Sequence, residues 1–328
     1  MSLKVESVDD RAGVVHLFSG IGKLEPRISV SFGMKLFRRP APAIAALRSQ
    51  PIETGKVEWM RELNDALAAS TETGRPVFAL FQEVPGCAGC KQFGKDVLSD
   101  PFVVEAIEGE FIPLLIHNNS GGRDAEVLRA YGEPAWNYQV VRFLDSGGDD
   151  VIPRRDRVWE TGPLLTRMVA SLEAAGREVP DYLRLLEQQH GGQLEEAFLV
   201  QPCFWVGEME IGQIDGVVFT EAGFMHGHEV TRVLFDPRFL TLESLYEQSA
   251  RRNVAHAVYT DNPARTDLGG RTTVDKPGRY RKAPASDQKR QLGRGLTGDY
   301  TESQLTKLNA FSRSRRGGAD KFLLPSQR

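Results

Sequence analysis

The sequence predicts an α/β layer fold for the first half of the chain, followed by a second domain of mixed strands and helices. Between residues 57 and 175, short apolar runs alternate with stretches in which apolar residues recur at helical spacing. This alternation is typical of α/β layers. The length of 328 residues also corresponds to about two domains of 100–200 residues each. We expect an extension over 1–56, an α/β domain over 57–176, a linker over 177–196 and a second domain over 197–328.

In the first half, alternation of apolar and polar residues at 14–18 and 28–32 predicts one or two strands. From residue 57 a helical pattern that includes Trp59, Leu63 and Leu67 runs to the break at Gly74. Three later apolar runs predict buried strands, and the stretches between them predict helices. The expected strands are 77–81, 111–116 and 138–144, and the expected helices begin near residue 87 and cover 124–131 and 164–175.

The second half repeats this alternation and ends in a basic tail. Strands are expected at 197–200, 217–222 and 229–235, and helices up to residue 214 and over 240–251. The last fifty residues hold 12 Lys or Arg against 4 Asp or Glu. Nucleic-acid binding would need aromatic residues that stack on bases, and those near the tail are few and irregularly spaced. We therefore expect a solvated surface, with a docking face for an acidic partner, such as the other domain, as the alternative.

Composition narrows the class of protein. Apolar residues make up 41% of the chain and charged residues 26%, which is ordinary for a soluble globular protein. The net charge of -3 argues against attraction of the whole molecule to nucleic acid. No apolar run approaches the roughly 20 residues of a membrane helix, and the first 35 residues lack a signal pattern. We expect a cytoplasmic protein whose thiols are reduced.

Two of the three cysteines form a Cys-x-x-Cys pair after a predicted strand. Cys87 would open a helix, where unpaired backbone N–H groups favour a thiolate, and Cys90 would lie one turn further on. This arrangement is suited to thiol–disulfide exchange, in which Cys87 attacks and Cys90 resolves the mixed disulfide. A zinc site and two buried structural thiols are the alternatives. The zinc interpretation lacks a second matched pair of ligands, so we expect no metal and no cofactor.

Residues 57–175 resemble the thioredoxin superfamily. The resemblance includes the strand at 77–81, the cysteine pair, residues 100–102 and the strand at 111–116. It implies that Pro134, before the strand at 138–144, is the cis-proline that faces the cysteines. Val84, Pro85 and Gly86 replace the Trp that usually precedes the pair, which resembles a bacterial subgroup with Cys or selenocysteine at the first position.

The third cysteine begins the sequence Cys203-Phe204-Trp205. A nucleophile beside two aromatic rings suits the reduction of a sulfoxide, because rings make favourable contacts with methyl and sulfur groups. A carboxylic acid must protonate the departing oxygen, and Glu208 and Glu229 are candidates.

Residues 197–281 resemble peptide methionine sulfoxide reductase A, with an α+β plait as the implied fold. The matching segments are residues 197–205, 216–224, 229–237, 242–245 and 275–281, in the family's order and at similar spacing. The resemblance implies roles for seven residues. They are Cys203 as the nucleophile, Phe204 and Trp205 as the wall for the methyl group, Glu229 as the acid, Tyr280 as a donor to the oxygen, and Phe224 and Asp275 as pocket residues.

The sequence departs from that family's pattern at several places. Pro202 replaces the glycine before the nucleophile, and Gly207 follows Val206 where the family has the glycine first. Phe224 replaces a tyrosine, which removes one hydroxyl from the pocket. The loop between residues 224 and 229 is short, and no recycling cysteine follows Cys203. Each change bears on whether the site keeps the family's activity, and a decayed domain in which Cys203 only packs in the core is the alternative.

Together the motifs predict a two-domain thiol oxidoreductase. Cys203 would reduce methionine sulfoxide, free or in an oxidised protein, and Cys87 with Cys90 would recycle it. An external thiol reductant would then restore the pair. The alternatives are a thioredoxin-like disulfide reductase with a non-catalytic second domain, and a redox-responsive binding protein. We expect no membrane partner.

Overall fold

The structure is a computed structural model of the chain. It describes residues 4–9, 14–18, 50–136, 139–263, 268, 270, 272–293, 296, 298–313 and 318–328. The chain divides into two compact units, residues 1–49 and 50–328. In the first unit, β1 (Lys4–Asp9) pairs antiparallel with β2 (Val14–Phe18), which confirms a strand at 14–18. The strand expected at 28–32 lies outside the described residues.

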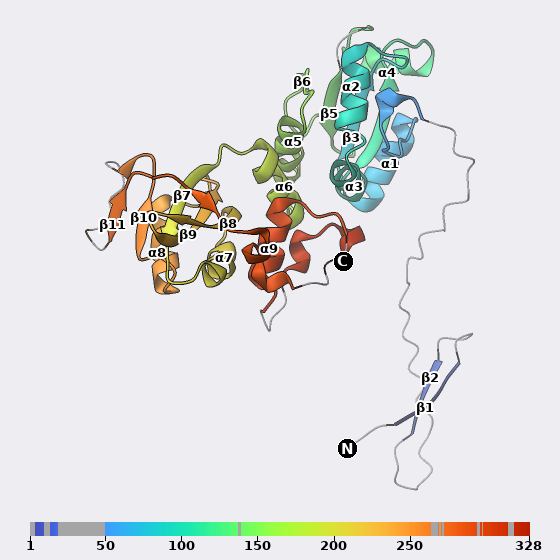
Figure 1. The fold of residues 1–328 in the computed structure, drawn as a ribbon. Coiled ribbons are helices and arrows are strands. Elements are labelled where there is room, and N and C mark those ends of the chain that lie inside the picture. Colours follow the sequence, from blue (N-terminus) through green and yellow to red (C-terminus); the bar gives the residue numbers. More distant parts are fainter. Residues whose placement is uncertain are drawn as a thin grey trace. The chain divides into compact units, whose positions relative to one another are not determined.

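The first sheet of the second unit has the strand order β4-β3-β5-β6. Figure 1 labels three of these strands, β3, β5 and β6. β3 (Val77–Gln82) pairs parallel with β4 (Ile112–His117) and antiparallel with β5 (Val140–Leu144), which also pairs with the short β6 (Arg155–Asp156). Every residue of β3 is buried. This is expected of a central strand covered on both faces, and the strands predicted from apolar runs are confirmed to within one or two residues.

Helices cover both faces of this sheet. Since successive side chains of β3 point to opposite faces, the strand contributes residues to two cores. Phe78 and Leu80 enter the core beside α2, α3, α5 and α6, and Val77 and Ala79 enter the core beside α1 and α4. The helices are α1 (Leu63–Thr73), α2 (Ala88–Asp96), α3 (Pro101–Glu110), α4 (Arg123–Ala130), α5 (Thr161–Ala174) and α6 (Asp181–Gly191), and a 3-10 turn, η1, covers Ile52–Thr54.

Two segments differ from expectation. The helix expected from residue 57 begins only at Leu63, because Met60 instead donates its backbone N–H to Pro113 and bridges to Leu114 of β4. The segment 177–196, expected to be a polar and partly helical linker, contains α6 but is not a separate linker. This helix packs on α5 and buries Tyr182 and Leu186 in the core of the first sheet.

The second sheet has the order β11-β10-β7-β9-β8-β12, antiparallel except for the β10–β11 pair. One face carries Ala197, Leu199 and Val233 into a core with α7 and α8, and the other carries a smaller cluster around Phe198 and Val230. The expected strands and helices of this half are confirmed. They are β7 (Glu195–Val200), α7 (Phe204–Gly212), β8 (Val217–Met225), β9 (His228–Phe235) and α8 (Leu242–Arg251). The sequence did not predict the short strands β10 (Ala257–Tyr259), β11 (Thr273–Asp275) and β12 (Arg281–Lys282).

The described part of the basic tail is not simply a solvated surface, which corrects the expectation. α9 (Glu302–Phe311) packs on α7 and β8, and the buried Lys307 donates through Nζ to the carbonyl oxygens of Gly212 (2.9 Å) and Ile214 (3.3 Å) at the end of α7. Leu324, near the C-terminus, enters the core of the first sheet. Short 3-10 turns complete this region at Ala285–Asp287, Arg290–Leu292, Asp320–Phe322 and Pro325–Gln327. Among the described helices, none has the length and apolar character needed to cross a membrane.

Candidate active site

Cys87 and Cys90 lie at the start of α2, after the loop that follows β3 of the first sheet. β3 ends at Gln82, and Cys87 is the N-cap residue of α2 with an extended backbone. Its Sγ lies 3.5 Å from Sγ of Cys90, and both thiols are free. Cys87 is exposed, whereas Cys90 is 1% exposed. An incoming sulfur can therefore reach Cys87, and Cys90 is within reach only of Cys87.

The surroundings push the two pKa values in opposite directions. The backbone N–H of Cys90 points at Sγ of Cys87 and lowers the pKa of that thiol, with the Cys90 thiol and the N–H of Gly89 adding to the effect. Burial raises the pKa of Cys90 to about 12, and the neighbouring Cys87 sulfur raises it further. Since the thiolate is the reactive form, these pKa shifts favour Cys87 over Cys90 as the thiol that reacts with a group from solvent.

Residues distant in sequence hold the loop before Cys87. The N–H of Gly86 donates to Oε1 of the buried Glu53 (2.9 Å), and Gln82 donates to the Glu53 carbonyl. On the other side, Asn119 accepts from the N–H of Val84 (3.1 Å) and donates to the carbonyl of Pro85 (3.1 Å). Sequence reasoning missed Glu53 and Asn119, because a loop contact made across more than 30 residues leaves no local pattern.

Pro134 does not have the geometry that the resemblance implied. The peptide bond before it is not cis. Within the described residues, the cis bond is Val84–Pro85, in the cysteine loop itself. Pro134 is exposed. The residue directly before β5 is the buried Gln139, which donates to the carbonyl of Val158 (3.0 Å) and accepts from its N–H (3.2 Å).

One group near the pair has the composition of a metal site. A carboxylate oxygen of Glu83 and the sulfurs of Cys87 and Cys90 all lie within 4.8 Å of one another. These three residues offer three ligands, one fewer than structural zinc sites use. The carboxylate also raises the pKa of both thiols through its charge. Glu83 is a functional neighbour that the Cys-x-x-Cys spacing alone did not reveal.

Cys203 occupies the equivalent place in the second sheet, between β7 and α7. It is the N-cap residue of α7 and is half-buried. The N–H of the next residue, Phe204, donates to Oε2 of Glu229 (2.9 Å). The Phe204 ring meets Trp205 and Phe224 edge to face, with centroids 6.0 and 5.4 Å apart. The structure thus brings together five of the residues predicted for this site.

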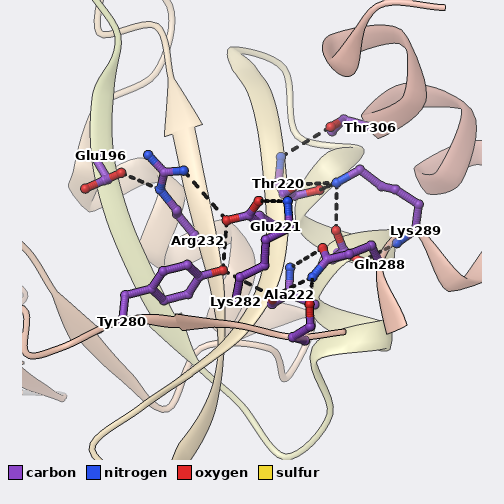
Figure 2. Close-up of polar contacts among 12 residues, drawn as sticks. Glu196, Thr220, Glu221, Ala222, Arg232, Tyr280, Lys282, Gln288, Lys289 and Thr306 are labelled. Atoms are coloured by element: carbon purple, nitrogen blue, oxygen red, sulfur yellow. Dashed lines mark hydrogen bonds and ion pairs between the residues drawn. The ribbon is translucent and has the colours of Figure 1, made fainter. Parts of the chain in front are cut away.

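Two predicted residues lie elsewhere. The Tyr280 hydroxyl shares its one proton between Oε1 of Glu221 (3.0 Å) and the Ala222 carbonyl (3.1 Å) (Figure 2). The Tyr280 ring packs on Phe198. Phe198 and Glu221 point to the sheet face opposite Glu229, so Tyr280 is not brought to Cys203. Asp275 is exposed on β11, at the other edge of the sheet from β12.

The alternative acid, Glu208, is already engaged. It is fully buried in α7, where it accepts from Nζ of Lys289 (2.7 Å) and from the Lys289 N–H (2.8 Å). Burial raises the pKa of Glu208, and the Lys289 charge opposes that rise. Glu229, which is bonded to the residue after the nucleophile, is therefore the better placed carboxyl group.

A comparison with models of protein families finds a match in the first half of the unit. Residues 58–146 match the model of a thioredoxin-like family, so this stretch is a thioredoxin-like domain. A thioredoxin from Thermus thermophilus is 23% identical, with 37% of this chain and 90% of that chain covered and a TM-score of 0.32. A DsbH oxidoreductase is 16% identical, with 42% and 98% covered and a TM-score of 0.31. A search of curated protein sequences found no match.

Proposed function

We propose that the thioredoxin-like domain catalyses thiol–disulfide exchange. The supporting observation is the contrast within the pair, in which an exposed Cys87 of lowered pKa lies 3.5 Å from a buried Cys90 of raised pKa. The Cys87 thiolate attacks a substrate disulfide, forms a mixed disulfide and expels one substrate thiolate. Cys90 then attacks Sγ of Cys87, releases the second substrate thiolate and leaves a Cys87–Cys90 disulfide. An external dithiol in the cytoplasm then reduces the Cys87–Cys90 disulfide and is itself oxidised.

Reduction of insulin by dithiothreitol tests this step. The wild-type chain accelerates it, and Cys87→Ser abolishes the acceleration. Cys90→Ser traps the mixed disulfide, which a mass measurement detects. Cys203→Ser is the matched control and keeps the full rate. An unchanged rate in Cys87→Ser would refute the proposal.

We further propose that Cys203 reduces an S-oxide, most simply methionine sulfoxide. The contact of Glu229 with the N–H of Phe204 supports this proposal, as does the cluster of three rings that Phe204, the residue after Cys203, forms with Trp205 and Phe224. The Cys203 thiolate attacks the sulfoxide sulfur and Glu229 gives a proton to the oxygen, which passes to Cys203 as a sulfenic acid while the thioether leaves. Cys87 condenses with the sulfenic acid, releasing water and forming a Cys203–Cys87 disulfide. Attack by Cys90 frees Cys203 and completes a two-electron reduction.

In the described part of the chain, Cys203 makes no sulfur contact with either cysteine of the pair, so the recycling step needs a direct test. The reduced protein, freed of reductant, is mixed with excess methionine sulfoxide and the thioether is counted. Wild type should yield about two equivalents per chain, one from Cys203 and one after the pair has reset it. Cys87→Ser/Cys90→Ser should yield about one, and Cys203→Ser none. Equal yields from wild type and the double variant would rule out recycling by the pair.

A further inference from the structure

Two guanidinium groups lie on the aromatic residues beside Cys203. Cζ of Arg281 is 4.3 Å from the centroid of the Phe224 ring, and Cζ of Arg290 is 5.2 Å from that of Trp205. Phe224 and Trp205 each contact Phe204, the residue that follows Cys203. Arginine on a ring keeps its outward N–H groups available for an anion while its planar face is covered. The rings proposed to hold the methyl group therefore also position two positive charges.

The backbone that carries these arginines is firmly attached to the sheet. Gln288 donates to the carbonyls of Ala222 (2.8 Å) and Ala283 (3.0 Å) and accepts from the N–H of Ala222 (3.0 Å) (Figure 2). Lys289 is anchored by Glu208 and by the Thr220 carbonyl. Arg281 is paired with Phe224 across β12 and β8. The segment from Arg281 to Arg290 is thus fixed at both ends, and little ordering is needed for its charges to act on a ligand.

The charge around Cys203 is unbalanced. Lys289 neutralises Glu208 within the buried pair, which leaves Glu229 as the carboxyl group next to the nucleophile. Across the described residues, neither Arg281 nor Arg290 forms an ion pair with a carboxylate. Among the residues that the structure describes, Arg290 donates to the Ser286 carbonyl (3.1 Å). Two exposed guanidiniums without an acidic partner are suited to an anion supplied by the ligand.

A cavity of about 560 Å³ borders Phe224 and Arg281, and its lining also includes Tyr280 from the opposite face of the sheet. Residues 224–227 and 279–281 line it, and they include Arg279 and Arg281 but no carboxylate. This volume is within the range of small-molecule sites. Phe224 and Arg281 are the lining residues that it shares with the surroundings of Cys203, so an aromatic ring and a positive charge meet where the cavity borders that site.

We propose that the Cys203 site takes a small sulfur compound that carries a free carboxylate close to its sulfur. Within the proposed sulfoxide reduction, on which this inference rests, that class is free or C-terminal methionine sulfoxide. An internal methionine sulfoxide in a protein has no carboxylate to offer. Arg281 and Arg290 are specificity-determining residues that hold the carboxylate, while the sulfur faces Cys203.

Alkylation of Cys203 tests anion selection without relying on turnover. In the full chain carrying Cys87→Ser/Cys90→Ser, the rates of modification by iodoacetate and by iodoacetamide are compared. Both reagents react with the thiolate, so their rate ratio is independent of the thiolate fraction. The iodoacetate-to-iodoacetamide ratio should fall about three- to tenfold in Arg281→Gln/Arg290→Gln, and in 1 M salt without the arginine changes. Arg251→Gln, an exposed arginine of α8, should leave it unchanged.

A turnover assay with two substrates tests carboxylate recognition separately from the proposed sulfoxide reduction. N-acetyl-methionine sulfoxide is compared with its uncharged N-methylamide. Wild type should show a KM at least about fivefold lower for the carboxylate, and the arginine double variant should lose that difference. Turnover of both substrates with equal KM overturns the inference and keeps the proposed function. Turnover of neither, with the alkylation preference intact, overturns sulfoxide reduction and keeps the anion site. An alkylation ratio that the arginine double variant leaves unchanged overturns the anion site.

Discussion

The rate at which each cysteine of the pair is alkylated, measured as a function of pH, should reveal the difference between their pKa values. The pKa of Cys90 is about 12, so at pH 7 about one Cys90 side chain in 100,000 is a thiolate, against about three in 100 for an unperturbed thiol. Ionisation alone therefore slows Cys90 about three thousandfold. Its 1% exposure adds a barrier to any reagent. Cys87, whose pKa is lowered, is more ionised at pH 7 than an ordinary thiol.

The assay is timed alkylation of the reduced chain with iodoacetamide, followed by peptide mapping. At pH 7 the pair should take up one label, at Cys87. As the pH is raised, the alkylation rate of Cys87 should reach half its maximum below about pH 8.5, which is the pKa of an ordinary cysteine thiol. Unfolding in guanidinium should make Cys90 react, which shows that the protection comes from the fold. Comparable labelling of both cysteines in the folded chain at pH 7 would refute the assigned roles.

Three further changes test the surroundings of the site and the tail. Glu83→Gln should lower the pKa of Cys87 and speed its alkylation at pH 6 about threefold, because the carboxylate charge now raises that pKa; an unchanged rate would contradict this. Burial lowers the pKa of Lys307 to about 8, so the unfolded chain holds the extra proton between pH 8 and about 10.4. Stability relative to Lys307→Met should therefore rise by about 3 kcal/mol across that window in urea titrations. Gly94→Ala should cost at least about 2 kcal/mol, because its Cβ would overlap the Ile52 carbonyl, whereas Gly121→Ala has no neighbour to meet and should be neutral.

Local patterns predicted the elements of the fold well where burial is decided locally. β3 is a run of five apolar residues in the sequence and a fully buried central strand in the structure. Its end, followed by Cys-x-x-Cys, placed Cys87 at a helix N-terminus, and α2 confirms that placement. The same reasoning located β7 and α7 around Cys203.

Contacts between distant segments could not be predicted in this way. The polar character of 177–196 suggested a linker, yet one face of α6 supplies Tyr182 and Leu186 to a core built mainly by residues far earlier in the chain. Lys307 counts as one more positive charge in the tail. Its burial follows only from the meeting of α9 with the end of α7. Composition gives the number of charged residues in a segment, but it does not show which of their side chains become buried.

The placement of Tyr280 shows a different limit, because order and spacing along the chain do not determine which face of a sheet a residue occupies. Glu229 pairs with Phe224, and Val230 pairs with Gly223. Since side chains alternate, a shift of one residue moves a group to the opposite side. Tyr280 packs against Gly223, which commits its hydroxyl to the face away from Cys203. A donor for an oxygen or a carboxylate at Cys203 must therefore come from the face that Phe224 shares, and the arginine stacked on that ring is Arg281.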